Sequence, residues 1–143
     1  MGRILSIDYG KKRTGIAVSD KLRLIANGLT TVPTVELFDF ISKYVAKEDV
    51  DCIVVGYPLQ PDGSDSENMK RVTPFVNRLR KLYPKITIEY YDERFTSVLA
   101  HRAIIEGGVK KRVRREDKGL VDMVSATILL EDYMEYLSIS SNH

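Results

Sequence analysis

The segment Ile4-Leu5-Ser6-Ile7-Asp8-Tyr9-Gly10-Lys11-Lys12-Arg13-Thr14-Gly15-Ile16-Ala17-Val18-Ser19 opens the chain with two apolar runs joined by a short polar turn. Residues 4–8 and 14–19 have the length and composition of β-strands, and the turn between them suits a hairpin. Asp8 closes the first run and is followed closely by Gly10, so we expect its carboxylate at a strand end beside a flexible backbone. The hairpin therefore predicts the start of a sheet with an acid at its edge.

The rest of the chain alternates strand-like and helical patterns. The predicted elements after the hairpin are, in order, a strand over 24–32, a helix over 35–47 capped by Thr34, a strand over 52–56, a turn-rich loop over 57–66, a second helix with Met69, Val72, Val76, Leu79 and Tyr83 on one face, a strand over 86–91, a third helix starting near 96, and a final helix over 118–137. Three strands in a meander followed by alternating helices and strands predict an α/β fold. We expect a mixed five-stranded sheet with helices on both faces and Asp8 near its centre.

Length and composition favour a single domain. The 143 residues, 43% of them hydrophobic, can build one core of ordinary size. We expect residues 1–138 to form this domain and residues 139–143 to form a flexible tail. The single cysteine, Cys52, lies in an apolar run, which indicates a buried thiol in a reducing compartment. No segment resembles a signal peptide or a membrane span, so we expect a cytoplasmic protein without membrane contact.

Three carboxylates occur where they could share a metal ion. Asp8 ends the first strand, Glu93 follows the strand over 86–91, and Asp122 heads an apolar face of the final helix. Burying such an acid is costly unless it is paired, and a divalent cation is one possible partner. Two Mg²⁺ or Mn²⁺ ions about 4 Å apart can neutralise a phosphodiester, activate water and stabilise the leaving oxygen. Asp8, Glu93 and Asp122 are therefore candidate metal ligands and catalytic acids.

Other catalytic chemistries find no support in the sequence. Two histidines, His101 and His143, and one cysteine make no zinc-binding set at a recognisable spacing. The chain has neither a nucleophile elbow nor a Walker loop. Acyl transfer and P-loop nucleotide hydrolysis are thus excluded as leading hypotheses.

Each acid also has an ordinary structural interpretation. Asp8 could be a turn residue before Gly10. Glu93 could form a surface ion pair with its neighbour Arg94, and Asp122 could pair with Lys118 one helical turn back. The sequence pattern alone leaves these alternatives open, although the joint placement of the three acids favours a shared site.

Basic residues gather in two places near these acids, on the loop after Asp8 and immediately before the helix that carries Asp122. A charged run of this kind is usually a solvated loop, but a phosphate backbone entering the site would meet both groups. We expect Tyr57, Tyr90 and Tyr91 to pack in the interior rather than to stack on bases. The candidate nucleic-acid-binding residues are Lys11, Lys12, Arg13, Arg94, Lys110, Lys111, Arg112, Arg114, Arg115 and Lys118.

Four motifs, in this order, resemble the YqgF family. They are IDYGKKRTGIAVSD at 7–20, GYPL at 56–59 with Gly63, DERFTS at 92–97, and KGLVD at 118–122 followed by Ala126. Together they cover nearly the whole chain. The family comprises Holliday junction resolvases, which are also described as pre-16S ribosomal RNA nucleases.

The resemblance implies a ribonuclease H-like fold and a bacterial cytoplasmic nuclease that uses Mg²⁺ or Mn²⁺ to trim the 5′ end of the 16S rRNA precursor. Asp8, Glu93 and Asp122 match the family's catalytic acids, and Arg13 and Arg94 match motif positions that could hold phosphate. One difference from RuvC-type resolvases affects the mechanism. Their fourth strand ends in an acid, whereas the fourth strand predicted here ends in Gly56-Tyr57-Pro58, so Glu93 would have to substitute.

Two other functions remain open from the sequence. One is resolution of branched DNA, which needs two coordinated cuts and therefore usually a two-fold dimer. The other is a non-catalytic nucleic-acid-binding protein that retains the fold. The residues distinguish neither structured RNA from branched DNA as substrate nor a monomer from a homodimer, and the small-subunit precursor of the ribosome is a possible partner. We expect the loop over 57–66 to border the substrate groove, because it follows the end of a central strand.

Overall fold

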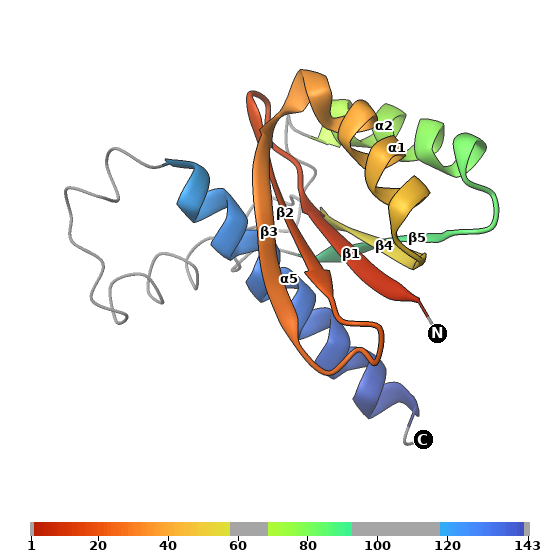
Figure 1. Ribbon diagram of the computed structural model, residues 1–143. Coiled ribbons are helices and arrows are strands. Elements are labelled where there is room, and N and C mark those ends of the chain that lie inside the picture. The colour runs from red at the N-terminus through yellow and green to blue at the C-terminus, as the bar shows by residue number, and fades with distance from the viewer. Residues whose placement is uncertain (1, 58–68, 93–117, 142–143) are drawn as a thin grey trace.

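A computed structural model describes residues 2–57, 69–92 and 118–141, which include one five-stranded sheet of order β3-β2-β1-β4-β5 (Figure 1). The strands are β1 (Arg3–Asp8), β2 (Arg13–Ser19), β3 (Ala26–Pro33), β4 (Val50–Tyr57) and β5 (Thr87–Asp92). Strand β2 runs antiparallel to β1 and β3, whereas β4 runs parallel to β1 and β5. The predicted α/β fold with a mixed sheet is confirmed, and the strand that ends in Asp8 is central.

Alternation along the central strand creates two cores on opposite faces of the sheet. Leu5 and Ile7 pack on one face beneath α1 (Leu37–Lys47) and α2 (Met69–Leu82). Ile4 packs on the other face against α5 (Lys118–Ser141). In Figure 1, α1 and α2 lie together on one side of the sheet and α5 crosses the other side. Helices therefore cover both faces, as the sequence predicts.

The apolar spacing predicted for the second helix is observed in α2. Its buried residues are Met69, Val72, Phe75, Val76 and Leu79. Each large side chain buried in this way contributes about 1.5–3 kcal/mol relative to an exposed one. Helix α1 buries Leu37 and Ile41 in the same core. These two helices close the face of the sheet opposite to α5.

The start of the first helix differs from the prediction. The chain enters α1 through a 3-10 turn, Thr34–Glu36, and neither helix start has a side-chain capping bond. The Thr34 hydroxyl instead donates to the carbonyl of Gly10 at 2.7 Å, and the Thr34 N–H donates to the carbonyl of Lys12 at 2.9 Å. The predicted cap is wrong because the turn after β1 lies close enough to take these bonds. Thr34 thereby holds the β1–β2 turn next to Asp8.

The final helix is longer than predicted. Helix α5 continues through Ser141, beyond the end predicted near Leu137. Leu137 still packs against the core, and extending an existing helix by one turn beyond its last anchor costs little. The helix predicted to start near residue 96 lies outside the described residues. Of the helices that are described, none has both the length and the apolar character needed to cross a bilayer.

The second core contains the single thiol of the chain. Cys52 is buried, and its Sγ lies 3.7 Å from the Tyr133 hydroxyl, which donates a hydrogen bond to Glu89. Burial raises the pKa of the Cys52 thiol and of the Tyr133 hydroxyl, so both groups stay protonated at neutral pH. The prediction of a buried thiol is confirmed. Tyr90 and Tyr91 also pack against the two cores, as expected, while the side chain of Tyr57 lies outside the description.

Candidate active site

Asp8 is the last residue of β1 and is half-buried. Ser6, two residues earlier, faces α5, because its hydroxyl donates to the Ala126 carbonyl at 2.7 Å. Side chains alternate along a strand, so Asp8 continues the face of Ser6. Its carboxylate therefore belongs to the face of the sheet that α5 covers, at the point where the strand ends.

Gly15 lies directly opposite Asp8 in the antiparallel pairing of β1 with β2. A Cβ at Gly15 would overlap the backbone carbonyl of Asp122 and lie 2.9 Å from the backbone nitrogen of Met123. Only glycine leaves room for the backbone of α5 at this point. This close approach places Asp122 beside the strand partner of Asp8. Two of the three predicted acids thus lie in the same region of one face.

Arg13 connects β2 to the same helix. Its Nε donates to Asp122 Oδ2 at 2.9 Å, and the two side chains are 42% and 24% exposed. A partly exposed pair of this kind stabilises the fold by about 1 kcal/mol or less. Its main effect is to orient the Asp122 carboxylate. The sequence left open an ion pair of Asp122 with Lys118, whose side chain lies outside the description, and the structure shows an ion pair of Asp122 with Arg13.

The carboxyl ends of three parallel strands meet at this edge of the sheet. Ile7, beside Asp8, is in register with Val55 of β4, and Tyr57 is in register with Asp92 at the end of β5. Reactive groups in open α/β sheets gather at such an edge. Glu93 directly follows Asp92 in the chain but lies outside the described residues. The same is true of Arg94, Lys110, Lys111, Arg112, Arg114 and Arg115, and of the side chain of Lys118.

Two further predicted cations lie on the turn beside Asp8. Lys11 and Lys12 are exposed, and the bonds from Thr34 fix the backbone of this turn. With Arg13 they place positive charge at the edge of the sheet where Asp8 ends its strand. Phosphate groups approaching this edge would be attracted by these side chains.

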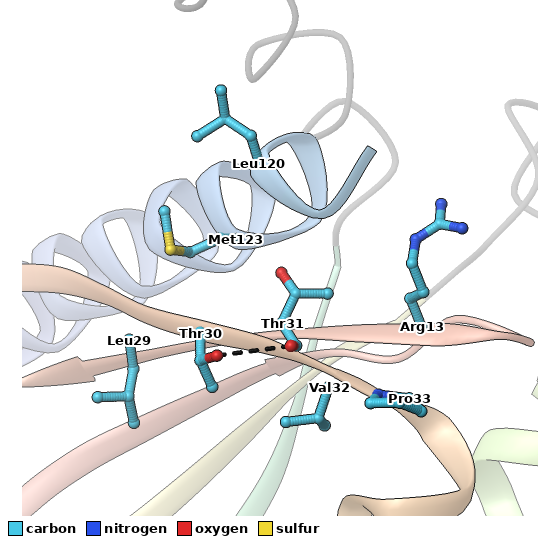
Figure 2. Close-up of a pocket in the computed structure, with 8 residues that line it drawn as sticks. All are labelled: Arg13, Leu29, Thr30, Thr31, Val32, Pro33, Leu120 and Met123. Carbon is cyan, nitrogen blue, oxygen red and sulfur yellow. Dashed lines mark hydrogen bonds between the residues drawn. The ribbon is translucent and has the colours of Figure 1, made fainter. Parts of the chain in front are cut away.

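A shallow groove of about 470 Å³ lies next to Arg13, between β3 and the first turns of α5 (Figure 2). Leu120 and Met123 of the helix lie across it from the strand, and the side chain of Thr31 points toward them, as Figure 2 shows. The sequence analysis did not identify these residues. No local pattern marks them, because the groove exists only where two segments distant in sequence come together.

The two described acids are chemically suited to a hard cation. Mg²⁺ and Mn²⁺ prefer carboxylate oxygens, which Asp8 and Asp122 supply from neighbouring elements. Across the part of the chain that the structure describes, no group of three or more metal-ligating residues is close enough to hold an ion. Glu93, the third predicted ligand, lies outside that part. The donor types present therefore fit the predicted metal, and the complete ligand set remains a prediction.

Comparison with known proteins identifies the family of this chain. A family model described as RuvX, Holliday junction resolvase, matches residues 2–136. The chain belongs to the RuvX family. The resemblance to the YqgF family noted in the sequence is thereby confirmed.

Several similar proteins are named after the processing of ribosomal RNA. The chain is 62% identical over 135 residues to a protein of Phocaeicola vulgatus named "Putative pre-16S rRNA nuclease", covering 94% of this chain and 96% of that protein. Proteins with the same name from Bacteroides thetaiotaomicron and Flavobacterium johnsoniae are 61% and 47% identical, over 94% of this chain and 97% and 96% of their own lengths. Among solved structures, Archaeoglobus fulgidus Pelota gives a TM-score of 0.44 at 14% identity over 96% of this chain and 37% of that one.

Proposed function

We propose that this chain is a metal-dependent nuclease that hydrolyses phosphodiester bonds and processes the 5′ end of pre-16S rRNA in ribosome biogenesis. Membership of the RuvX family and the names of its relatives support a nuclease. The main structural support is the approach of α5 to β2, which brings Asp122 beside the strand partner of Asp8 at the edge where β1, β4 and β5 end. Action on precursor rRNA implies a bacterial cytoplasmic location.

In this proposal Asp8, Glu93 and Asp122 are the metal ligands and catalytic acids. Bound Mg²⁺ or Mn²⁺, in the form of two ions, would supply charge neutralisation and an activated water for attack on phosphorus. Asp8 ends the central strand and would hold the metal together with Glu93 and Asp122. Glu93 follows β5 in the chain, and β5 is the strand beside β4. Glu93 would substitute for the acid that β4 lacks at its end.

The basic residues have a binding role in this proposal. Lys11 and Lys12 are exposed beside Asp8 and would contact backbone phosphates without reading sequence. Arg13 orients Asp122 through its Nε and is sufficiently exposed for the rest of its guanidinium to approach a phosphate. We assign the same binding role to Arg94, to the cluster at Lys110, Lys111, Arg112, Arg114 and Arg115, and to Lys118, on charge and chain position. The loop over 57–66 would border the bound strand.

The proposed RNA reaction makes single cuts, and each cut needs only one active site. A monomer formed by a single domain is therefore sufficient for it. The description of the family as Holliday junction resolvases supports a second candidate, which is cleavage of branched DNA. That reaction needs two symmetric cuts and therefore a homodimer. The precursor of the small ribosomal subunit is the partner that the first candidate implies.

The decisive experiment compares two end-labelled substrates, a pre-16S rRNA leader and a synthetic four-way DNA junction, with Mn²⁺ or with EDTA. Asp8→Asn is the test variant because it keeps the shape of the side chain and removes its charge. Asp39→Asn is the matched control, since Asp39 is an exposed acid on α1 that pairs only with the exposed Lys43 in the described residues. We expect RNA cleavage by the wild type and by Asp39→Asn, and none by Asp8→Asn or with EDTA.

The other outcomes each discriminate between functions. Cleavage of the junction alone would establish the resolvase alternative. Binding of RNA without cleavage of either substrate would reject the nuclease and support a non-catalytic binding protein. Full activity of Asp8→Asn would reject the proposed site.

A further inference from the structure

The turn between β2 and β3, residues 20–25, exposes three large aliphatic side chains at one end of the molecule. Leu22, Leu24 and Ile25 are 67%, 73% and 60% exposed. Single exposed aliphatic residues are common, but a group of them within one short turn is typical of an interaction surface. We call this group the aliphatic turn.

The carboxylate of Asp20 fixes the backbone of the aliphatic turn. It accepts hydrogen bonds from the N–H groups of Leu24 at 2.7 Å, Ile25 at 2.8 Å and Leu22 at 3.2 Å. The bond from Ile25 is the main cause that lowers the pKa of Asp20, so the carboxylate is ionised at neutral pH. The three exposed residues are therefore held in a defined arrangement rather than in a mobile loop.

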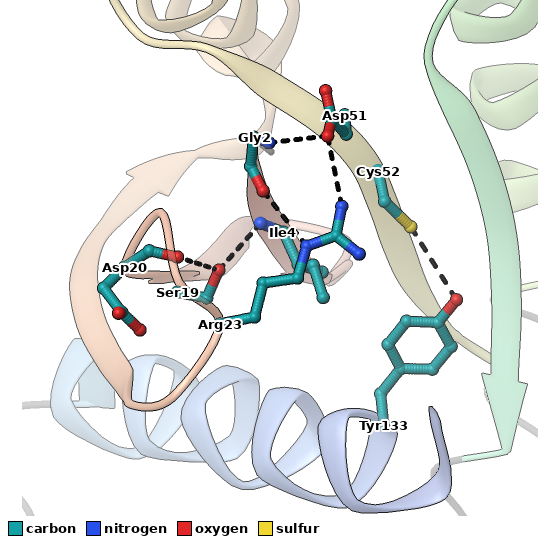
Figure 3. A network of polar contacts seen from close by, with 8 residues as sticks. All are labelled: Gly2, Ile4, Ser19, Asp20, Arg23, Asp51, Cys52 and Tyr133. Carbon is teal, nitrogen blue, oxygen red and sulfur yellow. Dashed lines mark hydrogen bonds and ion pairs between the residues drawn. The ribbon is translucent and has the colours of Figure 1, made fainter. Parts of the chain in front are cut away.

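Arg23 fixes the same turn from the opposite side. Its backbone has a φ of 58°, a left-handed conformation that non-glycine residues seldom adopt. Its guanidinium donates to the Gly2 carbonyl at 3.1 Å and to Asp51 at 3.3 Å, as Figure 3 shows together with the position of Asp20. These bonds compensate the strained backbone and turn the charge of Arg23 inward. A turn ordered in advance loses little conformational entropy when a partner binds.

The surroundings of the aliphatic turn are acidic. A shallow pocket of about 440 Å³ separates it from α5, with Leu24 and Ile25 on one side and Glu131, Met134 and Glu135 on the other. Glu131 and Glu135 are exposed. The cation that lines the pocket is Arg23, and its guanidinium is already bonded to Asp51. Lys21, the exposed cation of the turn, is not among the residues that line the pocket. The pocket therefore combines apolar side chains with a negative rim formed by Glu131 and Glu135.

We propose that the aliphatic turn and the adjoining face of α5 bind a basic, aliphatic segment of a partner protein. Aliphatic side chains of that segment would cover Leu24 and Ile25 and fill the pocket beside Met134. Its lysine or arginine residues would meet Glu131 and Glu135, since complementary charge favours encounter and fixes orientation.

Charge distinguishes this occupant from two others. A nucleic acid would bring phosphates against Glu131 and Glu135, which repel them. A second copy of the chain packed symmetrically would add the same two acids from its own surface to the interface. A basic, aliphatic protein segment can both cover the apolar residues and form ion pairs with the acids.

The test uses fluorescence anisotropy with two labelled synthetic peptides, one an amphipathic peptide of Leu and Lys, the other with Glu in place of each Lys. We expect wild-type protein to bind the Leu/Lys peptide and not the Leu/Glu peptide. Leu24→Ser with Ile25→Ser should weaken binding by about tenfold or more. Glu131→Lys with Glu135→Lys should weaken the Leu/Lys peptide similarly and create binding of the Leu/Glu peptide. Val35→Ser, at a 95% exposed position outside the turn, is the control and should change nothing.

All substituted residues are exposed, so circular dichroism should show a wild-type fold for each variant. Cleavage activity should also remain, because the turn lies at the end of β2 opposite to Arg13. Failure of the peptide-binding proposal can therefore be distinguished from failure of the proposed nuclease function. Equal binding of the two peptides, or equal loss in Val35→Ser, would overturn the proposal. A concentration-dependent dimer that Leu24→Ser with Ile25→Ser abolishes would assign the surface to a second copy instead. Loss of binding to the rRNA leader in the same variant would assign it to nucleic acid.

Discussion

The α-carbon of Gly15 lies against the backbone carbonyl of Asp122, so strand β2 and helix α5 touch at the position opposite Asp8. No side chain separates the two backbones there. The contact fixes how far along the sheet the start of α5 sits. The position of one proposed catalytic acid thus depends on a residue that has no functional group.

We expect Gly15→Ala to destabilise the fold by about 1–3 kcal/mol, because its Cβ overlaps backbone that cannot move without shifting α5. The cleavage rate should fall by more than the loss of folded protein explains, because Asp122 moves with the helix. Gly28→Ala is the matched control, because its Cβ would meet the flexible side chain of Met123 at 2.9 Å. Urea unfolding and cleavage assays check both variants. Equal effects of the two substitutions would show that the Gly15 contact has no special role.

Arg13→Ala should leave stability within about 1 kcal/mol of the wild type, because the Arg13–Asp122 pair is partly exposed. We expect cleavage to fall by about 10- to 100-fold, since Asp122 loses the group that orients its carboxylate. Arg13→Lys should recover only part of this loss, because an ammonium lacks the planar donor geometry. Thermal unfolding and single-turnover cleavage separate the two effects. A stability loss that accounts fully for the activity loss would contradict an orienting role.

Addition of Mn²⁺ should raise the thermal unfolding midpoint of the wild type, because an ion that binds only the folded state stabilises it by mass action. The shift should disappear in Asp8→Asn and in Asp122→Asn and persist in Asp39→Asn. Differential scanning fluorimetry in EDTA and in increasing Mn²⁺ measures this without any substrate. An undiminished shift in Asp8→Asn would place the metal elsewhere.

The free energy of unfolding should fall as pH rises above about 8.5, near the ordinary pKa of a thiol, and fall further above about 10, that of a phenol. Burial raises the pKa of Cys52 and of Tyr133 in the folded state. The unfolded chain therefore loses these protons first and binds fewer protons than the folded one, so stability decreases with pH. Tyr133→Phe should flatten the decline in urea titrations at pH 8 and 10.5. Tyr136→Phe, at an exposed position, should leave the decline unchanged. If the stability of Tyr133→Phe depends on pH in the same way as that of the wild type, this origin is refuted.

Local patterns were sufficient to predict most of the fold. The apolar run that ends in Asp8, the hairpin after it and the helical spacing of Met69, Val72, Val76 and Leu79 each record which face of an element is buried. Such periodicities follow from backbone geometry and can be read without knowing the partners of an element. The acids Asp8 and Asp122 were predicted for the same reason, because each one interrupts or heads an apolar face.

The sequence by itself determined which described segments form strands and helices and which face of each is apolar, because these features depend on neighbours within a few residues. Only the tertiary structure decided the partners. Asp122 pairs with Arg13, Thr34 holds the β1–β2 turn instead of capping a helix, and Asp20 and Arg23 fix an exposed turn. Side chains with several possible hydrogen-bond partners choose among them by distance, and that distance is set only when remote segments pack together.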